Sequence, residues 1–148
     1  MRKVILFLIF ILLISAAFLL SFGNNLRPVP GLRSLYINDS RIFVEVADTI
    51  EKHAQGLSGQ DSLPENQGMI FLFSSPDYYS FWMKGMKFPL DFVWINNRQV
   101  VEITQNVQPQ DYQPPNTLTS KEKVNMVLQI NAGMVEKMNI KIGDKIIF

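Results

Sequence analysis

Apolar and polar positions divide the chain into an unbroken apolar run and a longer segment that alternates like a β protein. Residues 4–22 form a run of 19 residues without a charged side chain. A helix of that length is about 28 Å long, close to the thickness of a bilayer core. Residues 24–33 contain two prolines and a glycine, which disfavour a continued helix. The pattern predicts a membrane anchor or signal segment over 1–23, a tether over 24–33 and a single domain over 34–148.

The charges beside the apolar run predict its orientation. Arg2 and Lys3 precede it, and positively charged flanks stay on the cytoplasmic side of a membrane. We therefore expect a single-pass protein whose domain lies outside the cytosol. The alternative is cleavage near residues 21–23, which would leave the domain secreted or periplasmic.

The first part of the domain alternates with a period of two. Residues 35–37 and 42–46 place apolar side chains at every second position, and the polar trio 38–40 separates them. This pattern predicts a β-hairpin. Asp48 and Glu51 then resemble a capping box at the start of a short helix, which ends before a glycine-rich turn.

Strand-length apolar runs dominate the rest of the chain. Residues 68–73, 79–84 and 90–95 are aromatic-rich runs bounded by Pro, Gly or Asn, and they predict core strands. Further strands are expected over 98–107, 124–130 and 145–148, a short helix over 132–138, and a long irregular connection over 108–123. The predicted fold is α+β, with two short helices and a mostly antiparallel sheet that can curl into a barrel.

Composition excludes several kinds of chemistry. The chain has no cysteine, so disulfides, iron–sulfur clusters, thiolate zinc and cysteine nucleophiles are ruled out. Without Arg2 and Lys3 it carries 12 basic and 13 acidic residues, a net charge of −1. Since nucleic-acid binding normally uses a clustered basic face, we predict no nucleic-acid partner. No motif indicates a cofactor.

Several motifs together resemble a known family. They are QGLSGQDSLP from Gln55, QGMIFLF from Gln67, FWMKGMKFPLDFVWI from Phe81, VLQINAG from Val127 and IKIGDKI from Ile140. The combination is similar to the bacterial and archaeal family called domain of unknown function 192. The resemblance implies a small exported or membrane-tethered domain of mixed β character, and it brings no activity. The family usually has an arginine where this chain has Gln60 and a glutamate where it has Gln129.

Lys84 and Asp91 are the charged residues of most interest. They flank the turn 85–89, so they would meet at the mouth of a hairpin if the runs on either side paired. Asp91 lies inside an apolar run and needs a polar partner if it is buried. The pair is interpreted as a structural ion pair or a capping interaction, and the alternative is the acid–base pair of an envelope hydrolase or transferase.

The aromatic residues and the histidine have plain interpretations. Trp82 and its aromatic neighbours either fill the core or line an apolar pocket. These neighbours are Tyr79, Phe81, Phe88 and Trp94. His53 is the single histidine and is expected to be solvated on the predicted helix.

Methionine offers a third hypothesis. Met83 and Met86 are three residues apart, and Met69 and Met126 could approach them from neighbouring strands. Thioethers select Cu(I), so the four could form a copper-binding module. Methionine is also a common core filler, which is the simpler interpretation.

Together these observations favour a membrane-tethered accessory domain without catalytic activity that binds a small ligand or an envelope protein. We expect it to use the face at 56–63 and the loop 108–120. No catalytic or metal-binding residue is assigned. The candidate binding residues are Gly56, Leu57, Trp82, Met83, Lys84 and Asp91.

Overall fold

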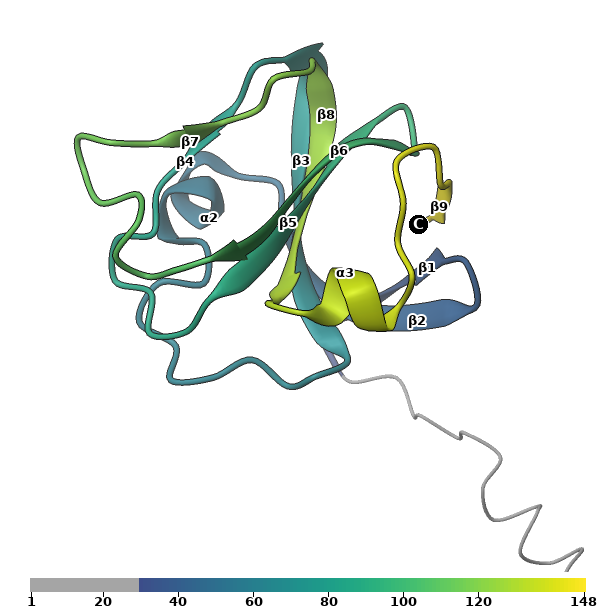
Figure 1. The fold of residues 1–148 in the computed structure, drawn as a ribbon, viewed down its shortest axis with the longest axis horizontal. Coiled ribbons are helices and arrows are strands. Elements are labelled where there is room, and N and C mark those ends of the chain that lie inside the picture. Colours follow the sequence, from purple (N-terminus) through teal and green to yellow (C-terminus); the bar gives the residue numbers. More distant parts are fainter. Residues whose placement is uncertain (1–29) are drawn as a thin grey trace, which may run out of the picture.

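The computed structural model describes residues 30–148, and the predicted membrane segment over 1–23 lies outside them. A seven-stranded sheet has the strand order β6-β5-β8-β3-β2-β1-β9, and a two-stranded ribbon, β4-β7, lies beside it (Figure 1). Within residues 30–148, no helix is long and apolar enough to cross a membrane. The elements are β1 (Arg33–Ile37), β2 (Ser40–Ala47), α2 (Ile50–Gln55), β3 (Gln67–Asp77), β4 (Ser80–Phe81), β5 (Leu90–Asn96), β6 (Gln99–Val107), β7 (Leu118–Thr119), β8 (Val124–Asn131), α3 (Met134–Lys137) and β9 (Ile146–Ile147).

The predicted hairpin at the start of the domain is confirmed, and a second one forms at an asparagine turn. β1 and β2 pair in register from Ile37↔Ser40. β5 and β6 pair from Asn96↔Gln99. The turn residues between β5 and β6, Asn97 and Arg98, both have positive φ, 48° and 66°. Such two-residue turns match the right-handed twist of the strands that they join.

The prediction of a strand over residues 79–84 is largely wrong. Only Ser80–Phe81 is a strand, and it pairs with β7 rather than with β5. β5 cannot accept another strand because β6 and β8 already occupy its two hydrogen-bonding edges. The predicted hairpin across the turn 85–89 therefore does not form.

Two smaller predictions also change. Thr49, rather than Asp48, caps the first described helix, since its Oγ1 accepts a hydrogen bond from the backbone N–H of Lys52 at 3.3 Å. β2 and β3 run parallel, while the other strand pairs of the sheet are antiparallel. The crossover between β2 and β3 contains α2, and this connection brings the helix over the sheet.

The two faces of the sheet carry separate hydrophobic clusters. α2, β4 and β7 lie over one face of the sheet, and the sheet curls toward its other face (Figure 1). The outer cluster, on the first face, includes Leu57, Phe71, Phe92 and Val127, and the inner cluster, on the curled face, includes Ile70, Val93, Leu128 and Val135. Alternation along β8 shows the division, since Leu128 and Ile130 belong to the inner cluster and Val127 belongs to the outer one. Both clusters bury large side chains, so residues 30–148 form a folding unit.

Backbone hydrogen bonds join β6, at one edge of the sheet, to the segment that leads into β9, at the other edge. Val100 N–H donates to Asp144 O at 2.8 Å, and Gly143 N–H donates to Val100 O at 2.8 Å. Ile146 then pairs with Ile37 of β1. The sheet is therefore a half-barrel, as the predicted curling implies.

Asp144 supports this closure and gives a pH prediction. Its Oδ2 accepts hydrogen bonds from Asn38 Nδ2 and from Lys141 N–H, each at 2.8 Å. These hydrogen bonds hold the pKa of Asp144 below its usual value of 3.8, and the bond from Asn38 has the largest effect. A lowered carboxyl pKa stabilises the fold above the usual value, and the stabilisation is lost as the pH falls through the folded pKa.

We expect Asn38→Gly to raise the pKa of Asp144, because glycine keeps the φ of 51° at this position but removes the amide. NMR titration of Asp144 measures the pKa, and urea unfolding at pH 7 and pH 2 measures the stability. The stability loss should be larger at pH 7. An equal loss at both pH values would contradict a role for the Asp144 charge.

Candidate ligand-binding cavity

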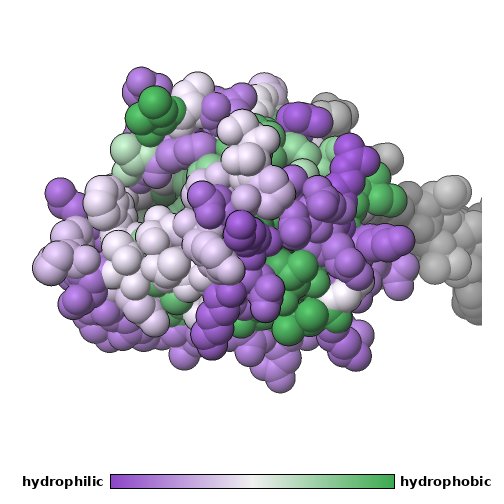
Figure 2. Space-filling model, turned by 90° about the horizontal axis from the view of Figure 1, so that it is seen from above, coloured by the Kyte–Doolittle hydropathy of each residue, from purple (hydrophilic) through white to green (hydrophobic). Residues whose placement is uncertain are grey.

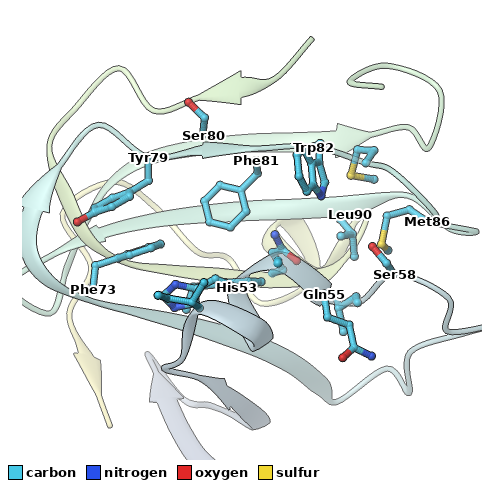
Figure 3. A pocket seen from close by; sticks show the side chains of 17 residues that line it. His53, Gln55, Ser58, Phe73, Tyr79, Ser80, Phe81, Trp82, Met86 and Leu90 are labelled. Carbon is cyan, nitrogen blue, oxygen red and sulfur yellow. The ribbon is translucent and has the colours of Figure 1, made fainter. Parts of the chain in front are cut away.

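A cavity of about 310 Å³ opens between α2, the segment around β4 and the outer face of the sheet. Figure 3 shows Tyr79, Phe81 and Trp82 along one wall, with His53 on the opposite side. Its lining comes from four parts of the chain. These are the helix and turn 50–58, β3 through Phe71 and Phe73, the segment 79–90 through seven residues, and β8 through Gln129.

The walls of the cavity are aromatic and packed against one another. Phe73 and Tyr79 stack with ring centroids 3.6 Å apart. Phe81 meets Phe71 edge to face at 4.9 Å. Because these rings pack against one another, the walls of the cavity are formed without a ligand.

The cavity lining contains no aspartate, glutamate, lysine or arginine. Ile50 and Trp82 belong to the lining but are 83% and 45% exposed, so they form an apolar rim. On the face of the molecule shown in Figure 2, apolar residues otherwise form separate groups among hydrophilic ones. The cavity is therefore suited to an uncharged, largely apolar ligand.

His53 is half-buried in the lining, so the expectation that it is solvated is wrong. Its Nε2 lies 2.9 Å from the carbonyl oxygen of Ala47. A carbonyl oxygen only accepts, so Nε2 carries the hydrogen of this bond. The ring also packs against Phe73 at 4.8 Å. The apolar surroundings and this hydrogen bond fix the orientation of the imidazole.

The hydroxyl groups of the lining already have partners. Ser58 Oγ donates to Lys84 O at 2.6 Å, and Tyr79 Oη donates to Ser75 O at 2.8 Å. Ser80 Oγ lies 2.7 Å from Thr119 Oγ1. None of these hydroxyls is hydrogen-bonded to His53, so the described residues contain no serine activated by this histidine. Nor do residues 30–148 contain a group of three or more His, Asp or Glu that could hold a metal.

The predicted pairing of Lys84 with Asp91 is wrong. Asp91 is fully buried on β5, and its two neighbours on that strand, Leu90 and Phe92, belong to the outer cluster. Strand alternation therefore places Asp91 on the inner face. Its Oδ1 accepts from Asn106 N–H at 2.8 Å and its Oδ2 from Val135 N–H at 3.0 Å. Lys84 is exposed and is not part of the cavity lining.

The other four candidate binding residues line the cavity. Gly56 and Leu57 follow α2, and Trp82 and Met83 follow β4. Four of the six candidate binding residues therefore lie at this cavity, while Lys84 and Asp91 lie elsewhere.

The four methionines do not converge. Met69, Met83 and Met86 belong to the outer cluster. Met126 packs against the inner cluster, on the other face of the sheet. A four-thioether copper site is therefore not built by these residues.

The loop 108–120 supports the cavity wall from behind. Met83 N–H donates to Tyr112 O at 2.8 Å, and Gln113 Nε2 donates to Met83 O at 2.9 Å. No residue of this loop is part of the lining. Its contribution is to hold the wall segment in place.

Sequence reasoning did not identify Gln129 as a binding residue, although it lies in the cavity lining. Gln60, the other position where the chain departs from the family pattern, does not line the cavity. One signal was available for Gln129. It is a lone amide inside the apolar run of β8, two residues from Val127 and therefore on the same face.

The fold and the cavity define a class of protein, namely small β-rich domains with a half-barrel sheet and an uncharged cavity on its outer face. Residues 34–148 match the model of the family described as "Uncharacterized ACR", domain of unknown function 192. The chain belongs to this family, as its motifs suggested.

Two solved structures are similar to this chain. A protein of unknown function from Novosphingobium aromaticivorans DSM 12444 is 31% identical, with a TM-score of 0.73 over 82% of this chain and 90% of that chain. A protein of Sinorhizobium meliloti 1021, described as a candidate transcription regulator, is 25% identical, with a TM-score of 0.73 over 78% of this chain and 92% of that chain. A comparison with curated proteins gave no match.

Proposed function

We propose that this domain binds a small, uncharged, largely apolar ligand in the cavity beneath α2, as a membrane-tethered module outside the cytosol. The observation that carries the proposal is the preformed cavity of about 310 Å³, whose lining is aromatic and aliphatic and contains no formally charged side chain. Volumes of this order bury most of a drug-sized ligand.

The alternative of an envelope hydrolase or transferase has less support. Asp91, its proposed acid or base, uses both carboxylate oxygens to accept backbone N–H groups on the inner face. The cavity lies on the outer face. An acid or base must reach the proton that it transfers, and Asp91 does not line the cavity.

The proposed tether suits an apolar ligand. The charge-free run 4–22 would hold the cavity within a few tens of ångströms of the bilayer, given the short tether that follows. Apolar molecules concentrate in lipid because water disfavours their surface. The module would then capture its ligand as the ligand leaves or enters the membrane.

The test uses residues 30–148 and the neutral fluorescent probe N-phenyl-1-naphthylamine. We expect saturable binding, seen as a blue-shifted and stronger probe emission. Ala54→Phe should weaken binding about tenfold, because a phenyl ring there occupies part of the cavity. Ala54 itself is exposed on α2, so the larger side chain can be accepted without disturbing the core.

Glu51→Phe is the matched control, since Glu51 is exposed on the same helix but does not line the cavity. Its probe affinity should stay within about twofold of the unmodified domain. Absence of saturable binding, or equal weakening by both variants, would refute the proposed site.

A further inference from the structure

Gln129 is a polar side chain enclosed by apolar neighbours on the cavity floor. It is 5% exposed. The strand register places it directly opposite Met69 on β3 and Phe92 on β5. Both neighbours belong to the outer hydrophobic cluster. The amide therefore lies in the middle of an otherwise apolar sheet surface.

Gln129 is nearly fully buried, but its amide is open to the cavity rather than sealed in the core. No hydrogen bond joins its side chain to another residue of the described part of the chain. Asn96 is a different case. Its Oδ1 is fully enclosed, and within residues 30–148 it is the one enclosed side-chain polar atom without a hydrogen-bond partner. The Gln129 side chain borders the cavity, so a ligand can reach it.

The amide has no partner within the described part of the chain, so a ligand that hydrogen-bonds it is favoured over one that leaves it unpaired. A ligand in the cavity can supply one. The glutamine amide offers two N–H donors and one carbonyl acceptor. Its best complement is an uncharged group that also both donates and accepts.

We infer that the ligand of this cavity carries a carboxamide-like group, which pairs with the Gln129 amide while the rest of the ligand lies against the aromatic walls. This inference rests on the proposed binding function and names its ligand class. A carboxylate on the ligand is disfavoured because no lysine or arginine lines the cavity to pair with it. Gln129 is accordingly the specificity-determining residue.

The experiment compares three ligands of similar shape for their ability to displace N-phenyl-1-naphthylamine from residues 30–148. 2-Naphthamide donates and accepts, 2-ethylnaphthalene does neither, and 2-naphthoate carries a charge. Each is titrated against the unmodified domain and against Gln129→Met, which keeps the length of the side chain but removes the amide. Leu90→Met is the matched control, because Leu90 also lines the cavity and the change nearly conserves volume.

Gln129→Met should weaken 2-naphthamide about tenfold and leave 2-ethylnaphthalene unchanged or tighter, since a site that hydrogen-bonds a ligand rejects the analogue that lacks the group. Leu90→Met should leave the ratio of the two affinities within about twofold. 2-Naphthoate should be the weakest of the three with the unmodified domain.

A measurement on the unmodified domain keeps the test independent of how the variant folds. In ¹H–¹⁵N spectra, the side-chain amide signals of Gln129 should shift on addition of 2-naphthamide by more than on addition of 2-ethylnaphthalene. If the fluorescent probe binds but neither the affinity ratio nor these signals respond, the inference about Gln129 is overturned and the cavity stands. If the probe itself does not bind, the proposed function fails instead.

Discussion

Asp91→Ala is expected to lower the free energy of unfolding by about 3–5 kcal/mol, because it leaves one buried and one partly buried N–H group without acceptors and creates a small void. The carboxylate is fully buried and ties Asn106 near the end of β6 to Val135 at the start of α3. Small domains are stable by only about 5–15 kcal/mol. The substitution therefore removes a large share of the total.

Urea unfolding of residues 30–148 measures the effect. Asp91→Asn should give a smaller loss than alanine, since the amide oxygen still accepts one N–H while its NH₂ group opposes the other. Asp61→Ala is the control, because the Asp61 side chain is 89% exposed and pairs only with Lys87 at the surface. That change should cost less than about 1 kcal/mol.

The result also decides whether Asp91 has a structural or a catalytic role. An unfolded or strongly destabilised variant is the outcome that a structural acceptor requires. A variant with stability within about 1 kcal/mol of the unmodified domain would contradict that role and return Asp91 to the list of reactive candidates.

Gly68→Ala is expected to destabilise the domain by about 3 kcal/mol, near the upper range for overpacking a tight interior. A Cβ atom at Gly68 would lie 2.7 Å from the backbone oxygen of Gln129 and 2.9 Å from Cγ2 of Ile130. A backbone oxygen within the β3–β8 ladder cannot move aside as a flexible side chain can. Gly68 is therefore needed for the close approach of these two strands.

The same urea measurement applies, with Ser74→Ala as the control because Ser74 is exposed on the same strand. Its effect should stay within about 0.5 kcal/mol. Since Gly68 contacts the strand that carries Gln129, the alanine variant should also weaken binding of N-phenyl-1-naphthylamine. An unchanged stability for Gly68→Ala would show that β8 can shift, and the tight-contact explanation would be wrong.

Much of the fold was readable from local signals. The polar turn at residues 38–40 predicted the first hairpin, and Asn38 has a positive φ that few residues tolerate. The apolar runs predicted β3, β5 and β8, since side chains on a strand alternate between two faces. The motifs predicted the family over about residues 41–148, and the family model matches residues 34–148. The anchor predicted over residues 1–23 remains a prediction.

Local signals did not predict which distant strands pair with one another. Three apolar runs look alike in sequence, yet only the packed fold gives both edges of β5 to β6 and β8 and leaves 79–83 to form a cavity wall. The same holds for the polar groups. Asp91 finds its partners 15 and 44 residues away, and the sheet separates it from the cavity.

Gln129 shows the difference most clearly. Its amide looks like a minor interruption of an apolar strand when only neighbours in the chain are considered. Residues from α2, β3 and the segment that begins with β4 line the same cavity, and none of them is near it in sequence. Periodicity and turn chemistry act over a few residues, whereas burial and hydrogen-bond satisfaction depend on contacts between remote parts of the chain. The elements therefore follow from local pattern, and the binding site follows from their packing.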